Sequence, residues 1–109
     1  MIEILFGGRT AEKVLLYLAN YGEGYAQGMA KNFNESLYSY QKQLLKLERA
    51  GILVSQLKGK TRLFSWNPRY PLKKELVLLL ERALDFLPEN ERKNYFRNRT
   101  RPRKTKKPL

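Results

Sequence analysis

The chain has 109 residues, the length of one ordinary domain, and 42% of them are hydrophobic, which is enough to form a core. It contains no cysteine and no histidine, which excludes disulfides, thiolate zinc sites, cysteine nucleophiles and imidazole bases. Its net charge of +12 favours a polyanionic partner, nucleic acid first and an anionic membrane surface second.

The first predicted element is ambiguous. Residues 2–6 (IEILF) are short and apolar, so they form either an edge strand or the end of a first helix. No basic region precedes an apolar stretch here, so we expect no signal peptide. A helix follows over about 11–21, with Thr10 as a hydroxyl N-cap and Gly22 at its end. The apolar face of this helix comprises Val14, Leu15 and Leu18.

Two helices joined by a tight turn come next, over about 25–32 and 37–50. Asn34 suits the left-handed conformation of such a turn, and Ser36 is the expected N-cap of the second helix. Gly28 costs the first helix roughly 1 kcal/mol against Ala, and a glycine there often permits close approach of another helix. The apolar positions are Ala26, Met29, Ala30 and Phe33 in the first helix, and Leu37, Tyr40, Leu44, Leu47 and Ala50 in the second, which ends at Gly51.

A β-hairpin and a long helix follow. The apolar-rich runs at 52–57 and 62–66 alternate with period two around the segment KGKT, which predicts antiparallel strands. A helix is expected over about 71–87, with Pro88 just past its end. Its run LVLLL falls far short of the roughly 20 apolar residues of a membrane span. Its apolar stripe is wide: Leu72, Leu76, Leu79, Leu80, Ala83, Leu84 and Leu87.

The basic charge lies mostly at the end of the chain. Residues 1–91 hold 13 Lys and Arg against 10 acids, a balance of +3, whereas residues 92–109 hold nine and no acid, a balance of +9. After residue 91 no apolar periodicity remains, so we expect this tail to be disordered on its own. Tyr95 and Phe96 interleave with its cations, and such a segment holds phosphates without base selectivity. Solubility is the alternative role.

The order of these elements predicts an α+β fold, a winged helix-turn-helix with a three-helix core, a β-hairpin wing and an additional long C-terminal helix. In this fold the helix at 37–50 enters the DNA major groove. Its exposed side carries hydrogen-bonding groups, cations and an aromatic ring: Tyr38, Ser39, Lys42, Gln43 and Lys46. Three cations surround the hairpin turn: Lys58, Lys60 and Arg62. A solvated helix in an unrelated helical domain is the alternative.

The segment LLKLERAGILVSQLKGKTRLFSWNP resembles winged helix-turn-helix transcriptional regulators of the bacterial and archaeal ArsR and MarR kind. In those families the recognition helix leads through a Leu-Glu-x-x-Gly-Leu-Val segment into a basic wing and a strand that ends on aromatic residues. MAKNFNES is similar to their second helix and turn, with Asn34 where the families usually have Gly. LFGGRTAEKVLLYL is similar to the start of such domains, so the resemblance covers about residues 4–70.

The resemblance implies contacts with bases or phosphates by Ser36, Tyr38, Ser39, Lys42 and Gln43, and wing contacts by Lys58, Lys60 and Arg62. It does not extend to metal sensing, because the chain has no Cys or His. We expect no metal, no cofactor and no catalytic residue. The acidic residues are scattered without a paired motif, so an enzyme is the least favoured class. The sequence identifies no small-molecule effector.

We expect three parts: a DNA-binding domain at 1–70, a C-terminal helix at 71–90 and a basic tail at 91–109. Flanking helices form the dimer interface in related proteins, so we expect a homodimer on a palindromic site in double-stranded DNA. Packing of all the leucines within a monomer is the alternative. The leading hypothesis is a cytoplasmic, sequence-specific transcriptional regulator that is not an enzyme. The second is a winged-helix protein-interaction adaptor whose tail binds nucleic acid generally.

Overall fold

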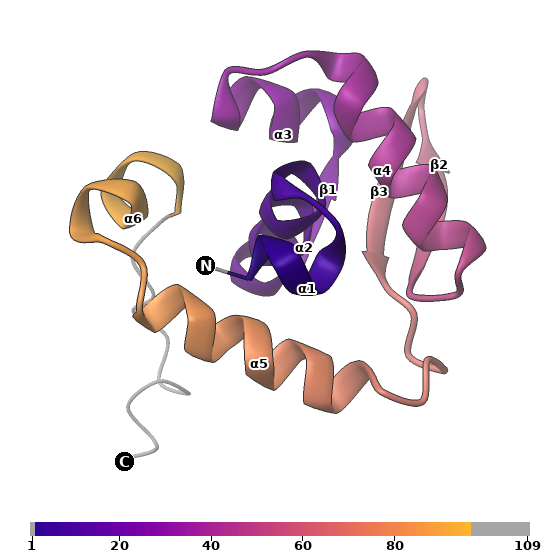
Figure 1. Cartoon of the computed structure of the whole chain (residues 1–109). Helices are drawn as coiled ribbons and strands as arrows, with labels where there is room; N and C mark the ends of the chain where they lie inside the picture. The colour runs from indigo at the N-terminus through magenta and orange to yellow at the C-terminus, as the bar shows by residue number, and fades with distance from the viewer. Residues whose placement is uncertain (1, 97–109) are drawn as a thin grey trace.

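The computed structural model of the chain describes residues 2–96 (Figure 1). The elements follow in the order α1 (Glu3–Phe6), α2 (Arg9–Tyr21), β1 (Glu23–Tyr25), α3 (Ala26–Phe33), α4 (Leu37–Arg49), β2 (Leu53–Lys58), β3 (Thr61–Trp66), α5 (Lys73–Asp85) and α6 (Glu89–Tyr95). Helix α2 lies at the centre, with the sheet on one side and α6 on the other (Figure 1). The structure therefore has the helix-turn-helix and hairpin order that the sequence predicts.

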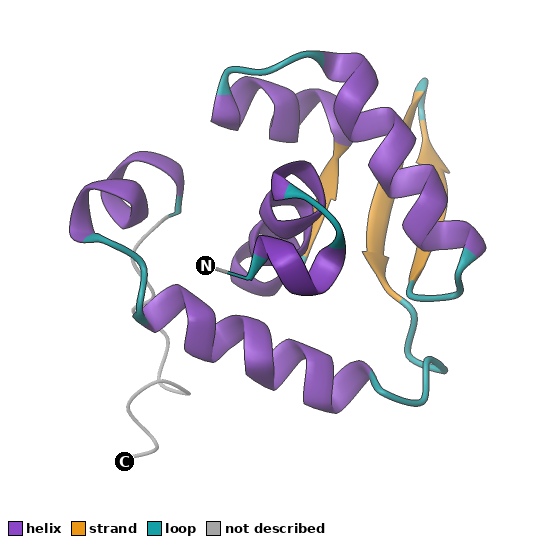
Figure 2. Ribbon diagram, in the orientation of Figure 1, coloured by secondary structure: helices purple, strands orange, loops and turns teal. Residues whose placement is uncertain are grey.

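The sheet has three antiparallel strands in the order β1-β3-β2. Strands β2 and β3 pair from Leu53 opposite Trp66 to Lys58 opposite Thr61, which leaves a two-residue turn whose first residue, Gly59, has a φ of 64°. Glycine adopts this left-handed conformation at little cost because it has no Cβ atom. The predicted hairpin is confirmed, and Figure 2 shows its strands beside α4.

One core joins the helices to the sheet. Its buried side chains come from α2, α3, α4, β2, β3 and α5, together with Ile2 and Phe96, and Phe6 of α1 and Tyr95 of α6 pack against them. The buried positions predicted for α2 are confirmed, since Val14, Leu15 and Leu18 are at most 1% exposed. The other main contributors are Met29, Phe33, Tyr40, Leu44, Leu53, Phe64, Leu80 and Leu84.

The first two helices differ from the sequence prediction at their boundary. Of the two alternatives for residues 2–6, the structure has the helix. The expectation that Thr10 caps the next helix is wrong, because α2 begins at Arg9 and its N-cap is Gly8. Gly8 O accepts the bond from Glu12 N at 3.2 Å, which places Thr10 inside the first turn. At the other end Gly22 closes α2 as predicted, with a φ of 89°.

The turn between α3 and α4 forms as predicted. Asn34 has a φ of 56°, and the amides of Asn34 and Glu35 donate to the carbonyls of Lys31 and Ala30. This pair of bonds is a Schellman motif, which satisfies the last carbonyls of α3. Ser36 Oγ then accepts from Ser39 N at 3.3 Å and caps α4.

Strand β1 is absent from the sequence prediction. It pairs Glu23 with Ser65, Gly24 with Phe64 and Tyr25 with Leu63. Three residues that include Glu and Gly carry no β pattern of their own, so only the edge that β3 offers makes this segment a strand. Gly24 also sits against α2, where a Cβ atom would lie 2.7 Å from Tyr17 Cε1.

Helix α5 is shorter than predicted, and its wide stripe of leucines divides in two. Leu80, Ala83 and Leu84 are buried in the core, and Leu76 and Leu87 pack against its margin. Leu72 and Leu79 are exposed, as are two further apolar residues of this region, Leu78 and Phe86. Part of the stripe is therefore uncovered in one copy of the chain.

The expectation of a disordered tail from residue 91 is wrong for residues 91–96. They belong to α6 and to Phe96, which is 7% exposed. Tyr95 O accepts bonds from Tyr21 Oη at 3.2 Å and from Asn32 Nδ2 at 3.0 Å. The rings of Tyr95 and Phe96 pack against Phe33, so these two aromatics belong to the core. The expectation for residues 97–109 lies outside the described residues.

Within residues 2–96, no helix has both the length and the apolar character to cross a bilayer.

Gly24→Ala tests the close approach of β1 to α2. We expect the free energy of unfolding to fall by about 1–3 kcal/mol, because the new methyl group overlaps the Tyr17 ring and lies 3.1 Å from Met29 Cε. Urea denaturation measures this change.

Gly28→Ala is the matched control. Its Cβ would meet only the Tyr17 hydroxyl at 3.8 Å, so the close helix approach suggested for Gly28 is not observed. We expect a gain of about 0.5–1 kcal/mol from helix propensity. Changes of equal sign in the two variants would contradict this account.

Candidate nucleic-acid interface

Helix α4 turns one side to the core and the other to solvent. Tyr40 and Leu44 are 0% exposed. Successive positions of the opposite side follow at spacings of four, three and four residues: Tyr38, Lys42, Leu45 and Arg49, all exposed. Lys46 is exposed beside them. This side is the outward face of α4.

The site residues predicted on this helix occupy different positions around it. Tyr38, Lys42 and Lys46 lie on the outward face, whereas Ser39 and Gln43 are half-buried at its margin. Ser36 is exposed at the helix start, and its Oγ lies 2.9 Å from Ser39 Oγ. The two serines therefore build the cap of α4 in the free protein.

Two outward-facing residues of α4 were not among the predicted site residues, Leu45 and Arg49. The same helical spacing that identifies Tyr38 and Lys42 would have identified them. The Lys42 ammonium group lies 5.6 Å from the centre of the Tyr38 ring, a cation–π contact that holds both side chains near the start of the helix.

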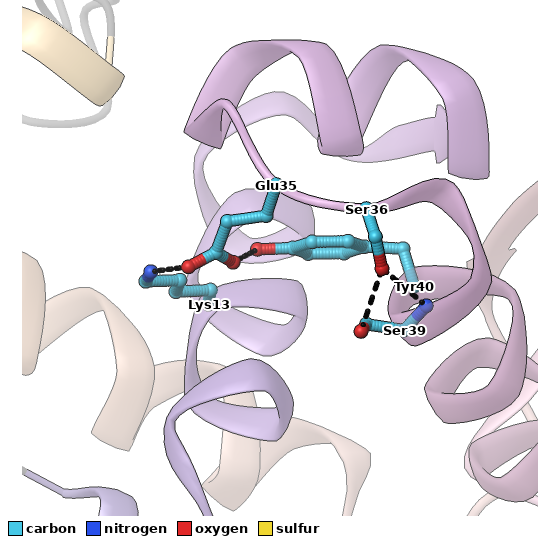
Figure 3. Close-up of polar contacts among 5 residues, drawn as sticks. All are labelled: Lys13, Glu35, Ser36, Ser39 and Tyr40. Carbon is cyan, nitrogen blue, oxygen red and sulfur yellow. Dashed lines mark hydrogen bonds and ion pairs between the residues drawn. The ribbon is translucent and has the colours of Figure 1, made fainter.

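A network of charged and polar groups joins α4 to α2 (Figure 3). Tyr40 Oη donates to Glu35 Oε1 at 2.5 Å, and Lys13 Nζ donates to Glu35 Oε2 at 2.7 Å. The Tyr40 ring stacks on Phe33, with centroids 5.9 Å apart and planes 3° from parallel. Because Tyr40 enters the core from the first turn of α4, these contacts set where that helix begins.

The titration of this network follows from its contacts. The bond from Lys13, and then the bond from Tyr40, hold the pKa of Glu35 below its ordinary value of 4.5. Burial, followed by the neighbouring carboxylate, raises the pKa of the Tyr40 phenol. At neutral pH Glu35 is ionised and Tyr40 keeps its proton, which is the state that the two hydrogen bonds require.

The one acid of α4, Glu48, is also engaged within the protein. Ser55 Oγ donates to Glu48 Oε2 at 2.6 Å and accepts from Arg62 Nη1 at 3.2 Å. The three side chains thus link α4 to β2 and β3. The carboxylates of Glu35 and Glu48 therefore point to internal partners, while the cations of α4 face solvent.

The base of the wing is fixed to the end of α4 by Asn67. Its side-chain Nδ2 donates to Gly51 O at 2.8 Å and its backbone amide donates to Ile52 O at 3.0 Å. Trp66 Nε1 donates to Leu18 O at 3.3 Å and fixes the same strand to α2. From this base the hairpin extends to Lys58 and Lys60, both exposed at its turn. The helix and the wing are therefore held as one unit.

A groove of about 370 Å³ separates α4 from the wing. Leu37, Gln41 and Leu45 line it from α4, and Leu57, Lys60 and Arg62 line it from the wing. Its remaining lining comes from the residues where β1 meets α3 and from β3. We call this cavity the α4–wing groove.

No group of three His, Cys, Asp or Glu side chains suited to holding a metal ion occurs among residues 2–96.

Solved structures share this arrangement. The YusO protein from Bacillus subtilis is 21% identical, with a TM-score of 0.55 over 77% of this chain and 65% of that one. A ZitR mutant from Lactococcus lactis in its apo form is 24% identical, with a TM-score of 0.55 over 82% and 68%. The adhesin competence repressor AdcR from Streptococcus pyogenes is 18% identical, with a TM-score of 0.51 over 76% and 69%.

These likenesses establish the fold, a winged helix-turn-helix. The chain spans less than two thirds of the length of YusO and slightly more than two thirds of ZitR and AdcR. No protein-family model and no curated protein sequence matches it.

Glu35→Gln tests the network that seats α4. We expect the free energy of unfolding at neutral pH to fall by about 1 kcal/mol, a value reduced for the partial exposure of the carboxylate. Because the folded-state pKa of Glu35 lies below 4.5, the advantage of the wild type is complete above that pH and is lost as pH falls through the folded-state pKa. Urea denaturation of both proteins from neutral pH to about pH 3 measures this dependence.

Glu89→Gln is the control. It removes a carboxylate 3.9 Å from Lys93 Nζ in an exposed pair, and we expect a change below about 0.5 kcal/mol. Equal losses in the two variants, or a Glu35→Gln loss independent of pH, would show that the network does not stabilise α4.

Proposed function

We propose that the protein is a sequence-specific transcriptional regulator that binds double-stranded DNA through the outward face of α4. The observation that carries this proposal is the separation of charge around that helix. Its cations face solvent, whereas the carboxylates of Glu35 and Glu48 are bonded to Tyr40, Lys13 and Ser55. An α-helix fits the width of the major groove, and a surface without free carboxylates avoids repulsion by phosphates.

Each predicted residue then has a role set by its place. Tyr38, Lys42 and Lys46 reach base edges or phosphates from the outward face, joined by Arg49. Gln43, Ser36 and Ser39 contact the DNA from the margin of α4. The wing cations Lys58, Lys60 and Arg62 bind the backbone beside the groove. AdcR, whose structure is similar, is named a repressor, which supports a regulatory role.

We further propose a homodimer that binds a palindromic site. Leu79 lies on α5, and Leu72 and Phe86, seven residues before and after it, are the residues at the two ends of the helix; all three are exposed. A second copy would cover this stripe. A two-fold dimer of this kind places two α4 helices about 34 Å apart, one turn of DNA.

The chain resembles regulators of the ArsR and MarR kind, and we propose that it is a member that does not sense metals, without a cofactor or a catalytic site. The rival proposal is a protein-interaction adaptor on the same scaffold. The two differ in the specificity of DNA binding, because an adaptor would bind duplexes of every sequence with similar affinity.

Selection from a random duplex pool at about physiological salt tests DNA recognition. We expect one palindromic sequence to be enriched. Replacing Lys42 and Gln43 with alanine should weaken binding to it at least tenfold, because a bidentate base contact is worth about 1–3 kcal/mol. Fluorescence anisotropy measures the affinities. Lys93→Ala on α6, which removes the same charge on the side of α2 away from the sheet, should change binding less than about twofold (Figure 1).

A chain ending at Phe96 is the second arm of this experiment. Phe96 is kept because it is buried, and the deletion removes seven Lys and Arg. We expect weaker binding to every duplex and a salt slope lower by up to about 6, with an unchanged preferred sequence. An altered sequence would make the tail a base-reading element, and a pool without enrichment would favour the adaptor.

Light scattering tests the dimer. We expect twice the chain mass of 12.9 kDa for the wild type and a single chain mass after replacing Leu79 and Phe86 with aspartate, because the charges would be buried without partners. Val54→Asp, on an exposed apolar residue of β2, should remain dimeric. A wild-type monomer at micromolar concentration would end the dimer proposal.

A further inference from the structure

The α4–wing groove is apolar at its centre although it opens to solvent. Leu57 of the wing is 62% exposed, and Leu45 and Leu37 of α4 are 43% and 37% exposed. A DNA-binding surface that made only phosphate contacts would need no leucines here. Their exposure on both sides of one groove indicates a ligand that offers apolar groups.

The edges of the groove indicate the charge of that ligand. Lys60 and Arg62 stand on the wing side, and none of the eleven described residues that line the groove is acidic. Leu45 also belongs to the outward face of α4, so the groove continues into the surface that carries Lys42 and Arg49. A ligand that fits has apolar groups and negative charge, and it extends over α4.

Duplex DNA fits this description better than a protein segment does. Eleven lining residues are fewer than the roughly 20–30 per side of a stable protein interface. If α4 lies in the major groove, the wing lies across one strand, and that strand passes between the two elements. Phosphates then meet Lys60 and Arg62. The 5-methyl group of thymine is the apolar group that base edges present in the major groove.

We propose that the α4–wing groove holds one DNA strand and recognises its thymines, with the 5-methyl group of one thymine packed against Leu45 and that of another against Leu37, about 12 Å away along α4. This inference rests on the proposed function and adds the base that α4 selects. Leu57 covers the sugar of the same strand. The preferred site therefore carries thymines where that strand passes α4.

Uracil tests the inference because it lacks only the methyl group and keeps every hydrogen-bonding group of thymine. The duplex enriched from the random pool is prepared with each thymine replaced in turn by deoxyuridine, and its dissociation constant is measured by anisotropy with the full chain. We expect at least one replacement to weaken wild-type binding about fourfold, the value of one buried methyl group.

A double-mutant cycle assigns that methyl group to the groove. Leu45→Ala should bind the thymine duplex more weakly and distinguish thymine from uracil at that position by less than about twofold. Leu37→Ala is the second variant, and circular dichroism confirms that each is folded. Val54→Ala truncates an exposed side chain outside the groove lining and should keep the fourfold preference.

Equal preferences for thymine in the wild type and in both leucine variants would overturn the inference, as would the absence of any methyl effect. If Leu45→Ala and Leu57→Ala bind all duplexes as the wild type does, the groove does not hold a DNA strand and the inference is overturned. A pool that yields no enriched duplex overturns the proposed function itself, whereas enrichment without methyl dependence overturns only this inference.

Discussion

The position of α4 depends on how Tyr40 is held. The ring is fully buried and stacks on Phe33, and its hydroxyl donates to a carboxylate that also binds Lys13 of α2. A buried phenol without a partner would cost free energy, so the ionised Glu35 is required at this place. The same carboxylate stands in the turn before α4. One interaction therefore satisfies the core and fixes the start of the helix that carries the candidate site.

The wing depends on a second set of contacts at the other end of α4. Glu48, Ser55 and Arg62 form a bridge from the helix to both long strands, and Asn67 binds the carbonyls that follow the helix. These bonds fix the width of the α4–wing groove. They also occupy the acid of α4, so that the surface facing outward is cationic and partly apolar. The same side chains therefore hold the wing against α4 and keep acidic charge away from the outward face of that helix.

The C-terminal elements complete the core of the winged-helix unit. Helix α5 buries Leu80 and Leu84 beside α2, and α6 places Phe96 against Phe33. Phe33 also stacks on Tyr40, so the last described residues contact the cluster that seats α4. The boundary expected near residue 70 therefore separates elements that share one core. What α5 leaves uncovered is a stripe of apolar side chains, which a second copy of the chain is proposed to cover.

The sequence by itself determined helices α2 to α5, the turn and the hairpin, because each has local causes. Ser36 caps a helix, Asn34 and Gly59 accept left-handed conformations, and periodicity separates helices from strands. It also identified the cationic side of α4. Tertiary structure alone decided β1, which exists only as a partner of β3, and the packing of Tyr95 and Phe96 against Phe33. It also decided which polar groups bind one another: Glu35 binds Lys13, 22 residues away, and Ser55 joins Glu48 of α4 to Arg62 of β3, pairings that no local pattern encodes.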